Sequence, residues 1–391
     1  MRNKIILLFI CLFLLCGCNN YRELNDLAII TGIAIDKADN GYEMSFLIAN
    51  SPKAQTSSKE GEAKTTVYSG TGQSLTEAAK AIATESPKQL YFGHVNVVVI
   101  SEDIAKDGFF KVADWLIRNT EMRKQFYLMQ AKDEKAGNIL KIVSPLESFP
   151  SQSIATLIKS NRDTQSLSID TNYTTFVSRA LETGYDPVLP SISIEGKVKK
   201  GSSEKNLETT EPETYLKLSD IALFQKDKFV GYIDERGGQA INIFNNEVNE
   251  LRFDFEYNDN LMGFSSANMK TKMNIKDINT IELKVSGSGH ILEVDGEIDL
   301  TNTKIVKEIE NALETHMKKQ LNQTIEKLQN KFKSDVLGIG RQMFIKYPNK
   351  WEKIKDEWNN KYFPKLDITI QTDLTIDGSG SLNNSIEEVQ S

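Results

Sequence analysis

The sequence predicts a mixed α/β (α+β) protein in which helices pack on mixed β-sheets. Short β-branched runs alternate with helical patterns in the first half of the chain, for example over residues 95–131. A long amphipathic helix is predicted at residues 303–333, where apolar residues recur at steps of four or three. An alternating strand follows at residues 366–377. Because the helix has one apolar stripe to bury, we expect it to lie along a sheet.

The N-terminal half opens with a predicted hairpin. Residues 27–36 have the pattern of a strand buried on both faces, and residues 42–49 are its expected antiparallel partner across a turn that ends at Gly41. Ser74 and Glu77 form a capping box, which predicts a helix start there. The other predicted elements are a loop at 51–64, strands at 65–69, 95–100 and 126–131, helices at 109–117, 151–159 and 174–183, and an extended segment at 188–194.

The chain of 391 residues is long enough for two or three domains. Residues 201–217 are polar and charged, and we predict that they form a linker or loop between two larger regions. The predicted regions are an N-terminal mixed α/β region at 18–200 with two subdomains, a C-terminal α/β domain at 218–377 and a flexible tail at 378–391. The C-terminal domain would begin with a hairpin at 222–234 and continue with strands between 250 and 300.

Composition excludes several functional classes. With 47 Lys and Arg against 54 Asp and Glu, the net charge is -7, so the chain as a whole gains no affinity for nucleic acid. Beyond residue 18 there is no cysteine, which excludes disulfide scaffolds, cysteine-ligated metals and a cysteine nucleophile there. The three histidines, His94, His290 and His316, are too scattered to suggest a metal site.

Residues 1–17 have the pattern of a secretory signal peptide. A basic start at Arg2 and Lys4 precedes an apolar run at 5–16, which is shorter than the roughly 20 residues of a membrane span. The string Leu15-Cys16-Gly17-Cys18 resembles the bacterial lipobox, which implies S-diacylglycerol and N-acyl groups on Cys18. Two or more acyl chains hold a protein stably on a membrane. The alternative is an ordinary secretory peptide in which Cys18 is incidental.

The tether after Cys18 is short. Residues 19–26 are mostly polar, and at about 3.3 Å per residue they reach at most roughly 26 Å. If Cys18 carries lipid, the folded part lies close to the headgroups, which favours a partner embedded in the same membrane.

No pattern of catalytic residues emerges. The chain lacks G-x-S-x-G, P-loop and H-E-x-x-H motifs, and the string SGSGH at 286–290 is more typical of a turn or bulge. His94 is expected to pack or to form a hydrogen bond at a strand start. The alternating acids Glu293, Asp295, Glu297 and Asp299 could suggest calcium, but their spacing favours the solvated face of a strand.

Two groups of residues are possible partner contacts. Arg118, Glu121 and Arg123 follow a predicted helix and form either surface ion pairs or a docking patch. Trp351 and Trp358 are seven residues apart, on one face of a predicted helix. They either pack in the core or belong to an exposed aromatic patch, which would mark an interface.

Several ordered blocks of the chain resemble the Ger(x)C family, the lipoprotein C subunits of nutrient germinant receptors in spore-forming bacteria. After the lipobox these blocks are YRELNDLAIITGIAID, GQSLTEAAKAIATESPKQLYFGHVNVVVISEDIAKDGF, RNTEMR, ALFQKDKFVGYID, DVLGIG and YPNKWEKIKDEW. Two positions depart from the family pattern: Tyr21 stands where tryptophan is frequent, and Ala34 where glycine is frequent. The resemblance extends over essentially the whole chain.

The resemblance implies a three-domain mixed α/β protein, tethered through Cys18 to the outer face of the spore inner membrane. It implies two integral-membrane partners, an A subunit and a transporter-like B subunit, in a complex that responds to small nutrients. It supplies no catalytic, cofactor or metal residue, so we predict a non-enzymatic subunit. One alternative is a solute-binding lipoprotein of a transporter, which requires a deep cleft between two similar lobes. Another is an extracytoplasmic hydrolase, which requires a nucleophile or paired acids in a pocket.

Overall fold

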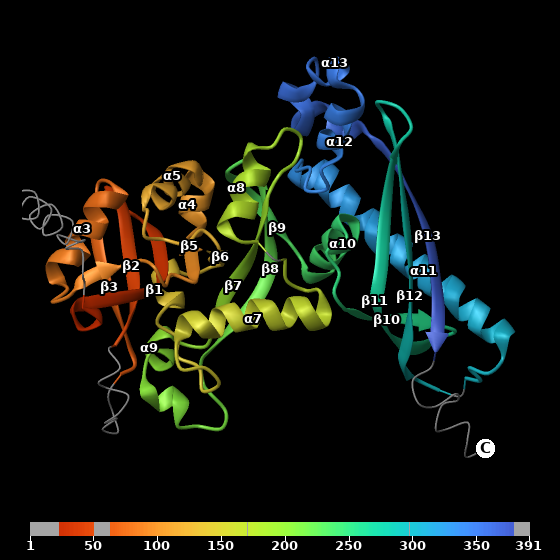
Figure 1. Cartoon of the computed structure of the whole chain (residues 1–391). Coiled ribbons are helices and arrows are strands. Elements are labelled where there is room, and N and C mark those ends of the chain that lie inside the picture. Colours follow the sequence, from red (N-terminus) through yellow and green to blue (C-terminus); the bar gives the residue numbers. More distant parts are fainter. Residues whose placement is uncertain (1–22, 51–62, 170, 297, 379–391) are drawn as a thin grey trace, which may run out of the picture.

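Two β-sheets with helices packed on them make up the described part of the chain. The computed structural model describes residues 23–50, 63–169, 171–296 and 298–378. Within these residues, nine strands form the first sheet, on the left in Figure 1, and four form the second, on the right. The predicted mixed sheets, their covering helices and the long helix on a sheet are confirmed. The division into three domains stays a prediction.

The first sheet has the order β3-β2-β1-β5-β6-β7-β8-β9, with β4 paired to β1. Strands β1, β5, β6 and β7 are parallel to one another, and antiparallel strands flank them on both sides. Strands buried on both faces favour β-branched residues, and β5 consists of three valines and an isoleucine. The strands are β1 (Leu27–Ala38), β2 (Gly41–Ala49), β3 (Thr65–Gly72), β4 (Gln89–Tyr91), β5 (Val97–Ile100), β6 (Tyr127–Ala131), β7 (Val188–Glu195), β8 (Tyr215–Gln225) and β9 (Lys228–Ile233).

Helices cover both faces of this sheet. They are α3 (Leu75–Glu85), α4 (Glu102–Asp107), α5 (Phe110–Arg118), α6 (Ala136–Ile139), α7 (Pro150–Gln165), α8 (Tyr173–Leu181) and α9 (Val198–Gly201), with short 3-10 turns η1 (Leu24–Asp26) and η2 (Glu204–Leu207). Val98 of β5 lies in one buried cluster with Val112 of α5. Val99 lies in another cluster with Ile154 of α7. Alternate residues of one strand thus hold helices on opposite faces.

The predicted capping box at the start of α3 is confirmed. The Ser74 hydroxyl accepts a hydrogen bond from the Glu77 N–H at 3.1 Å, and the Glu77 carboxylate accepts one from the Gln73 N–H at 2.8 Å. Both bonds satisfy backbone donors that the first turn leaves without a helical partner.

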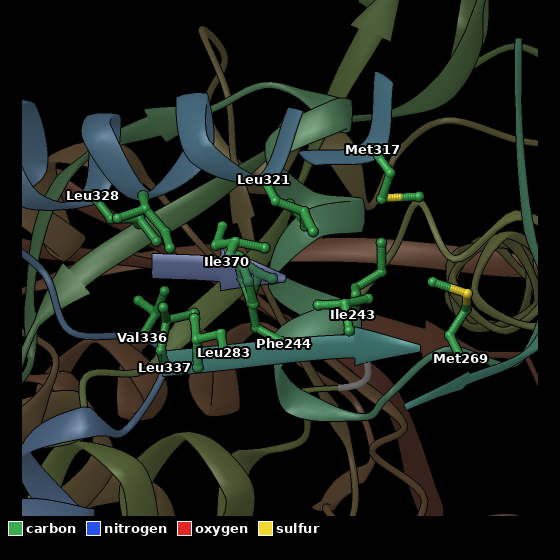
Figure 2. Packing of buried hydrophobic residues seen from close by; sticks show 14 of the residues in the cluster. Ile243, Phe244, Met269, Leu283, Met317, Leu321, Leu328, Val336, Leu337 and Ile370 are labelled. Carbon is green, nitrogen blue, oxygen red and sulfur yellow. The ribbon is translucent and has the colours of Figure 1, made fainter. Parts of the chain in front are cut away.

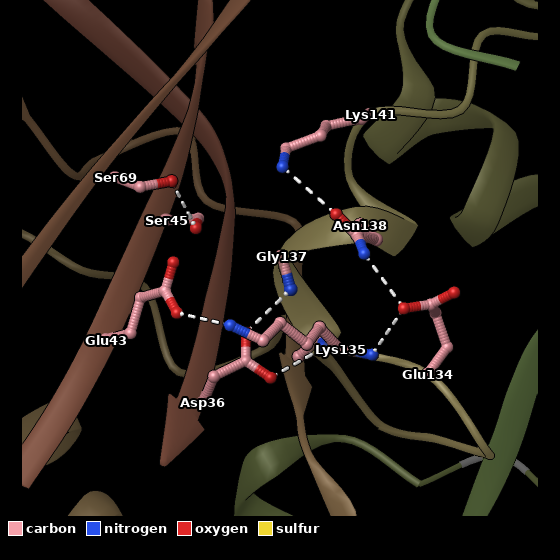
Figure 3. Close-up of polar contacts among 10 residues, drawn as sticks. Asp36, Glu43, Ser45, Ser69, Glu134, Lys135, Gly137, Asn138 and Lys141 are labelled. Carbon is pink, nitrogen blue, oxygen red and sulfur yellow. Dashed lines mark hydrogen bonds and ion pairs between the residues drawn. The ribbon is translucent and has the colours of Figure 1, made fainter. Parts of the chain in front are cut away.

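A buried carboxylate links the ends of β1 and β6. Asp36 accepts hydrogen bonds from the N–H groups of Ala136 and Gly137, each at 2.8 Å, as Figure 3 shows. Burial raises the pKa of Asp36, although these two bonds favour the charged form. Gly137 has no room for a side chain, because a Cβ there would lie 2.7 Å from the Ser45 hydroxyl oxygen. Asp36 therefore anchors α6 on the sheet.

The second sheet has the order β10-β11-β12-β13. Its first two pairs are antiparallel, and β12 and β13 are parallel. The strands are β10 (Leu251–Tyr257), β11 (Asn260–Ile275), β12 (Thr280–Val294) and β13 (Asp367–Gly378). The helices of this part are α10 (Glu235–Asn245), α11 (Thr303–Glu326), α12 (Ile339–Lys346) and α13 (Pro348–Trp351), followed by the short turns η4 (Lys355–Glu357), η5 (Trp358–Tyr362) and η6 (Phe363–Lys365).

The long helix lies on the second sheet as predicted. α11 continues as a π-helical segment, η3 (Lys327–Phe332). In Figure 2, Met317, Leu321 and Leu328 of this helix face Ile370 of β13. The stripe is buried at Ile309, Leu313, Met317, Leu321, Ile325, Leu328 and Phe332. Burial of this stripe is what holds the helix along the sheet.

Three local predictions are wrong. The predicted strand beyond residue 293 ends at Val294, because a bulge at Leu292 breaks the alternation and leaves this side chain 56% exposed. Asp295 and Asp299 lie beyond this strand, so the described acids Glu293, Asp295 and Asp299 do not share one strand face, and Glu297 lies outside the described residues. The segment predicted as a loop at 201–217 ends earlier, since β8 begins at Tyr215 and η2 lies within it, whereas its role as a linker between domains stays a prediction. Strand β5 starts at Val97 rather than residue 95, which leaves His94 in an exposed turn beside Tyr91.

Candidate functional site

A buried polar junction joins the two sheets. Asp335 lies in the segment between the long helix and α12, and its carboxylate accepts hydrogen bonds from the N–H groups of Ile339 at 3.1 Å and Gly340 at 2.7 Å. The Trp358 indole N–H donates a third bond to it at 2.9 Å. Asp335 thus satisfies N–H groups of the first turn of α12 and orients an indole ring at the same time.

A second buried carboxylate completes the junction. Asp186, just before β7, accepts hydrogen bonds from the N–H groups of Lys226 and Asp335, each at 2.9 Å. It also accepts one from the Asn359 side chain at 2.6 Å. Because Lys226 lies in the β8–β9 turn, one carboxylate connects the first sheet to the segments on both sides of α12.

Close backbone contact tightens this junction. The Gly184 carbonyl accepts a hydrogen bond from the Arg341 N–H at 2.9 Å. A Cβ on Gly340 would lie 2.6 Å from Trp351 and 2.7 Å from the Trp358 indole nitrogen. The two indole rings, with centroids 5.0 Å apart, therefore lie directly on a glycine.

Burial raises the pKa of both carboxyl groups. It raises the pKa of Asp335 to about 7, although the bonds from Gly340, Trp358 and Ile339 favour the charged form. The negative charge of Asp186 raises the Asp335 pKa further, and burial also raises the pKa of Asp186. The junction therefore carries a group that titrates near neutral pH.

We expect the indole N–H resonance of Trp358 to report this titration. When Asp335 loses its proton, the hydrogen bond becomes charge-assisted and stronger, so the resonance should move downfield with a midpoint near the pKa of about 7. Proton-nitrogen NMR spectra recorded from pH 5 to pH 9 measure the shift. Trp115 of α5, which contacts Phe92 instead, is the internal control. A Trp358 resonance that stays constant over this range would contradict the raised pKa.

A surface pocket of about 580 Å³ lies beside the junction, between the loop at 182–186 and the segment at 355–360. Perturbed acids beside a pocket are candidates for catalysis. Here, however, Asp335 is fully buried and each carboxylate accepts three hydrogen bonds from the protein. This arrangement suits a structural joint better than a general acid or base. The two unlike sheets also differ from the similar lobes of a solute-binding protein.

The structure separates the predicted contact residues into two places. Arg118 is the last residue of α5 and forms an exposed ion pair with Asp114 at 2.8 Å. For Arg118 the structure therefore shows a surface ion pair, the first of the two alternatives. Glu121 and Arg123 lie in the turn after it, where Arg123 is exposed and the Glu121 N–H donates to the Asn119 side chain. The docking role of this cluster stays a prediction.

Trp351 and Trp358 are both buried, so the rings form core packing rather than an exposed aromatic patch. They do not share one helix face, because α13 ends at Trp351 and Trp358 starts a separate turn. Pro348 begins α13, and the chain after it continues in separate 3-10 and π turns, which bring the two rings together without a shared helix face. A partner contact through these residues stays a prediction.

Sequence reasoning missed the paired carboxylates Asp186 and Asp335. The sequence around Asp335 carries no clear signal, because Asp335 lies four and five residues before the N–H groups of Ile339 and Gly340, beyond the spacing of an ordinary N-cap. Nothing local indicates that Asp186, 149 residues away, contacts the same segment.

Cys18 lies outside the described residues. Among the residues that the structure describes, no group of three or more His, Cys, Asp or Glu side chains could hold a metal ion. None of the helices in the described ranges is both long enough and apolar enough to cross a membrane.

Comparison with known proteins identifies the family. The model "Spore germination protein N-terminal domain" matches residues 20–194, and "Spore germination B3/GerAC like, C-terminal" matches residues 219–380. Spore germination protein KC of Bacillus subtilis (strain 168) is 31% identical, over 98% of this chain and 97% of its own. The chain belongs to the Ger(x)C family. Its membership connects it to spore germination.

Other relatives extend this result. Spore germination protein GerQC of Bacillus cereus is 24% identical over 97% of this chain and 99% of its own. The crystal structure of the GerBC protein has the same fold, with a TM-score of 0.54 and 16% identity over 91% of this chain and 100% of that one.

The Ger(x)C regions meet at the buried junction. Asp186 belongs to the first matched region, whereas Asp335 and Trp358 belong to the second. Strand β9 and residues 219–225 of β8 also belong to the second region, yet they complete the sheet of the first. In this Ger(x)C protein the junction therefore holds together two parts that share a sheet.

Proposed function

We propose that this chain is the lipid-anchored, non-enzymatic C subunit of a spore nutrient germinant receptor, needed for germination in response to small nutrients. The observation that carries the proposal is the 31% identity with spore germination protein KC over nearly the whole length of both chains. The lipobox that ends at Cys18 supports the anchored form.

The proposed partners are the integral-membrane A and B subunits, and the proposed location is the outer face of the spore inner membrane. Acyl chains on Cys18 and a tether of a few residues would confine the folded part to a thin layer above the bilayer. Confinement raises the effective concentration of membrane-embedded partners, so modest contacts suffice for assembly.

The proposed action is through protein contacts rather than catalysis. The two most perturbed acids, Asp186 and Asp335, are buried and engaged with backbone N–H groups. Their geometry supports a rigid two-sheet body that transmits contacts between partners.

Replacement of Cys18 by alanine tests the anchoring step. We expect most of the variant protein to leave the membrane fraction and the nutrient response of the spores to be strongly impaired, because the acyl chains supply the membrane affinity. Cys11→Ala, inside the signal and outside the lipobox, is the matched control and should behave as wild type. The measurements are immunoblots of membrane and soluble fractions and loss of optical density after nutrient addition.

Equal membrane retention and equal germination of the Cys18→Ala and wild-type spores would refute the anchored subunit. Copurification from spore membranes tests the partners separately. Recovery of the chain without A and B subunits would contradict the assembly.

A further inference from the structure

The exposed face of α12 carries two large apolar side chains. Phe344 is 42% exposed and Ile345 62% exposed, whereas Met343 of the same helix is buried in the core. A shallow hollow of about 430 Å³ lies beside them, lined in part by Thr183 and Trp351. One side of helix α12 packs against the protein, and its outer side also carries apolar residues. Exposed apolar residues of this kind indicate a surface that contacts something outside this chain.

The same segment is strongly basic in an acidic protein. Residues 339–366 contain seven Lys or Arg against three Asp or Glu, although the whole chain has a net charge of -7. Three of the cations have acidic partners, since Arg341 pairs with Glu182, Lys355 with Glu352 and Lys361 with Glu357. The cations of this segment are Arg341, Lys346, Lys350, Lys353, Lys355, Lys361 and Lys365.

Lys350 and Lys353 are exposed. The Lys350 ammonium lies 5.1 Å from the Tyr347 ring centroid, so this cation lies over an aromatic ring. Lysines that flank exposed phenylalanine and isoleucine are typical of helices that lie at the surface of an anionic membrane.

Strand direction places this segment at the end of the protein where the described chain begins. Strands β1, β5, β6 and β7 are parallel, so their first residues lie at one end of the sheet. α12 contacts the loop just before β7, through the Arg341 N–H and the Gly184 carbonyl. Three strand spacings separate β1 from β7, or about 14 Å. Figure 1 shows α12 and α13 at the top, above α8.

The anchor is close to this end. Only five peptide steps join Cys18 to Glu23, the first described residue, so their Cα atoms are at most about 18 Å apart. Leu24, at the beginning of the first sheet, is also exposed. With acyl chains on Cys18, this end of the sheet must stay near the headgroups.

We propose that α12 and α13 form a second membrane contact, in which Phe344 and Ile345 enter the headgroup region and Lys350 and Lys353 bind anionic phospholipid headgroups. The inference rests on the lipid anchoring proposed above. Lipid, rather than a protein, is the occupant because the excess of positive charge complements anionic headgroups and the tether keeps this surface beside them. The contact would fix the orientation of the whole body on the bilayer.

The sequence allows a direct test with one fluorescent label. The mature chain contains no thiol except Cys18, whose sulfur would be acylated, so Ile345→Cys introduces a single reactive site. The acylated full-length protein is reconstituted in vesicles of phosphatidylcholine with phosphatidylglycerol and labelled with an environment-sensitive dye. Tyr215→Cys is the control, because Tyr215 is 52% exposed and pairs with Glu195, the last residue of β7, at the opposite end of the strand whose beginning α12 contacts.

We expect a blue-shifted emission at position 345 and quenching by headgroup-region spin-labelled lipid that is roughly twofold or more stronger than at position 215. The difference should disappear in Lys350→Glu/Lys353→Glu protein and in vesicles of phosphatidylcholine alone. All of these positions are exposed, and circular dichroism checks that each variant is folded.

If the protein stays on the vesicles but quenching is equal at positions 345 and 215, the second contact is overturned and the anchor remains intact. Loss of vesicle retention in every variant would instead show that the anchoring proposal fails. Undiminished quenching at position 345 without anionic lipid would overturn the headgroup assignment. A change at position 345 only after addition of the A or B subunits would show that this surface binds protein.

Discussion

Replacement of Asp335 by alanine is expected to lower the free energy of unfolding by about 3–5 kcal/mol, because it leaves three buried donors without an acceptor. These donors are the N–H groups of Ile339 and Gly340 and the Trp358 indole. Asp335→Asn should cost less, since an amide oxygen can still accept from part of this set. Chemical denaturation followed by tryptophan fluorescence measures the loss.

Asp356→Ala is the matched control, because Asp356 is exposed in the neighbouring segment. It should change stability by less than about 0.5 kcal/mol. Equal stability of the Asp335→Ala and Asp356→Ala proteins would contradict the structural role of the junction.

The loss caused by Asp335→Ala should also depend on pH. The pKa of Asp335 is raised from 3.8 to about 7, so the folded protein binds a proton more tightly than the unfolded chain does. The stability that this group contributes is complete below pH 4 and declines as the pH rises through about 7. The difference between wild type and the alanine variant should therefore be larger at pH 5 than at pH 8. A difference that grows with pH would contradict the raised pKa.

The second large effect is expected for Gly340→Ala. A methyl group there would lie 2.6 Å from Trp351, 2.7 Å from Trp358 and 2.8 Å from the Gly184 backbone. All three neighbours are held by packing or backbone contacts, so the segment must shift, at a cost of about 2–4 kcal/mol. Thermal unfolding monitored by circular dichroism measures this cost.

Gly378→Ala provides the comparison, since a Cβ at that position meets its nearest neighbour at an ordinary 3.4 Å. Its midpoint should stay close to that of wild type. If the two alanine variants unfold at the same temperature, the close packing of α12 on Gly184 is wrong.

The elements that the sequence predicted well are those with a local cause. Ser74 and Glu77 are three residues apart, and their hydrogen bonds form within the first turn of α3. The stripe from Ile309 to Phe332 repeats often enough to specify one buried helix face. Where a single residue interrupts a pattern, as Leu292 does, the strand prediction failed because a bulge leaves no clear sign in the pattern.

The junction could not be predicted in this way. Asp186 and Asp335 are 149 residues apart, and each has an ordinary local sequence. Whether such an acid is exposed or buried depends on which segments fold over it, and the raised pKa follows from that burial. For the same reason the sequence left two alternatives for Trp351 and Trp358, core packing or an exposed aromatic patch. Only the position of the surrounding segments shows that both rings are buried.

By itself the sequence determined the α/β class, the long helix and the resemblance to germination proteins, because each of these is carried by short blocks of neighbouring residues, and lipidation at Cys18 stays a prediction. Only the tertiary structure decided that β8 and β9 complete the first sheet, that two distant aspartates share one buried junction, and that the basic α12–α13 segment contacts the loop before β7. These features arise from contacts between residues far apart in sequence, whose free energy depends on burial and distance rather than on local pattern.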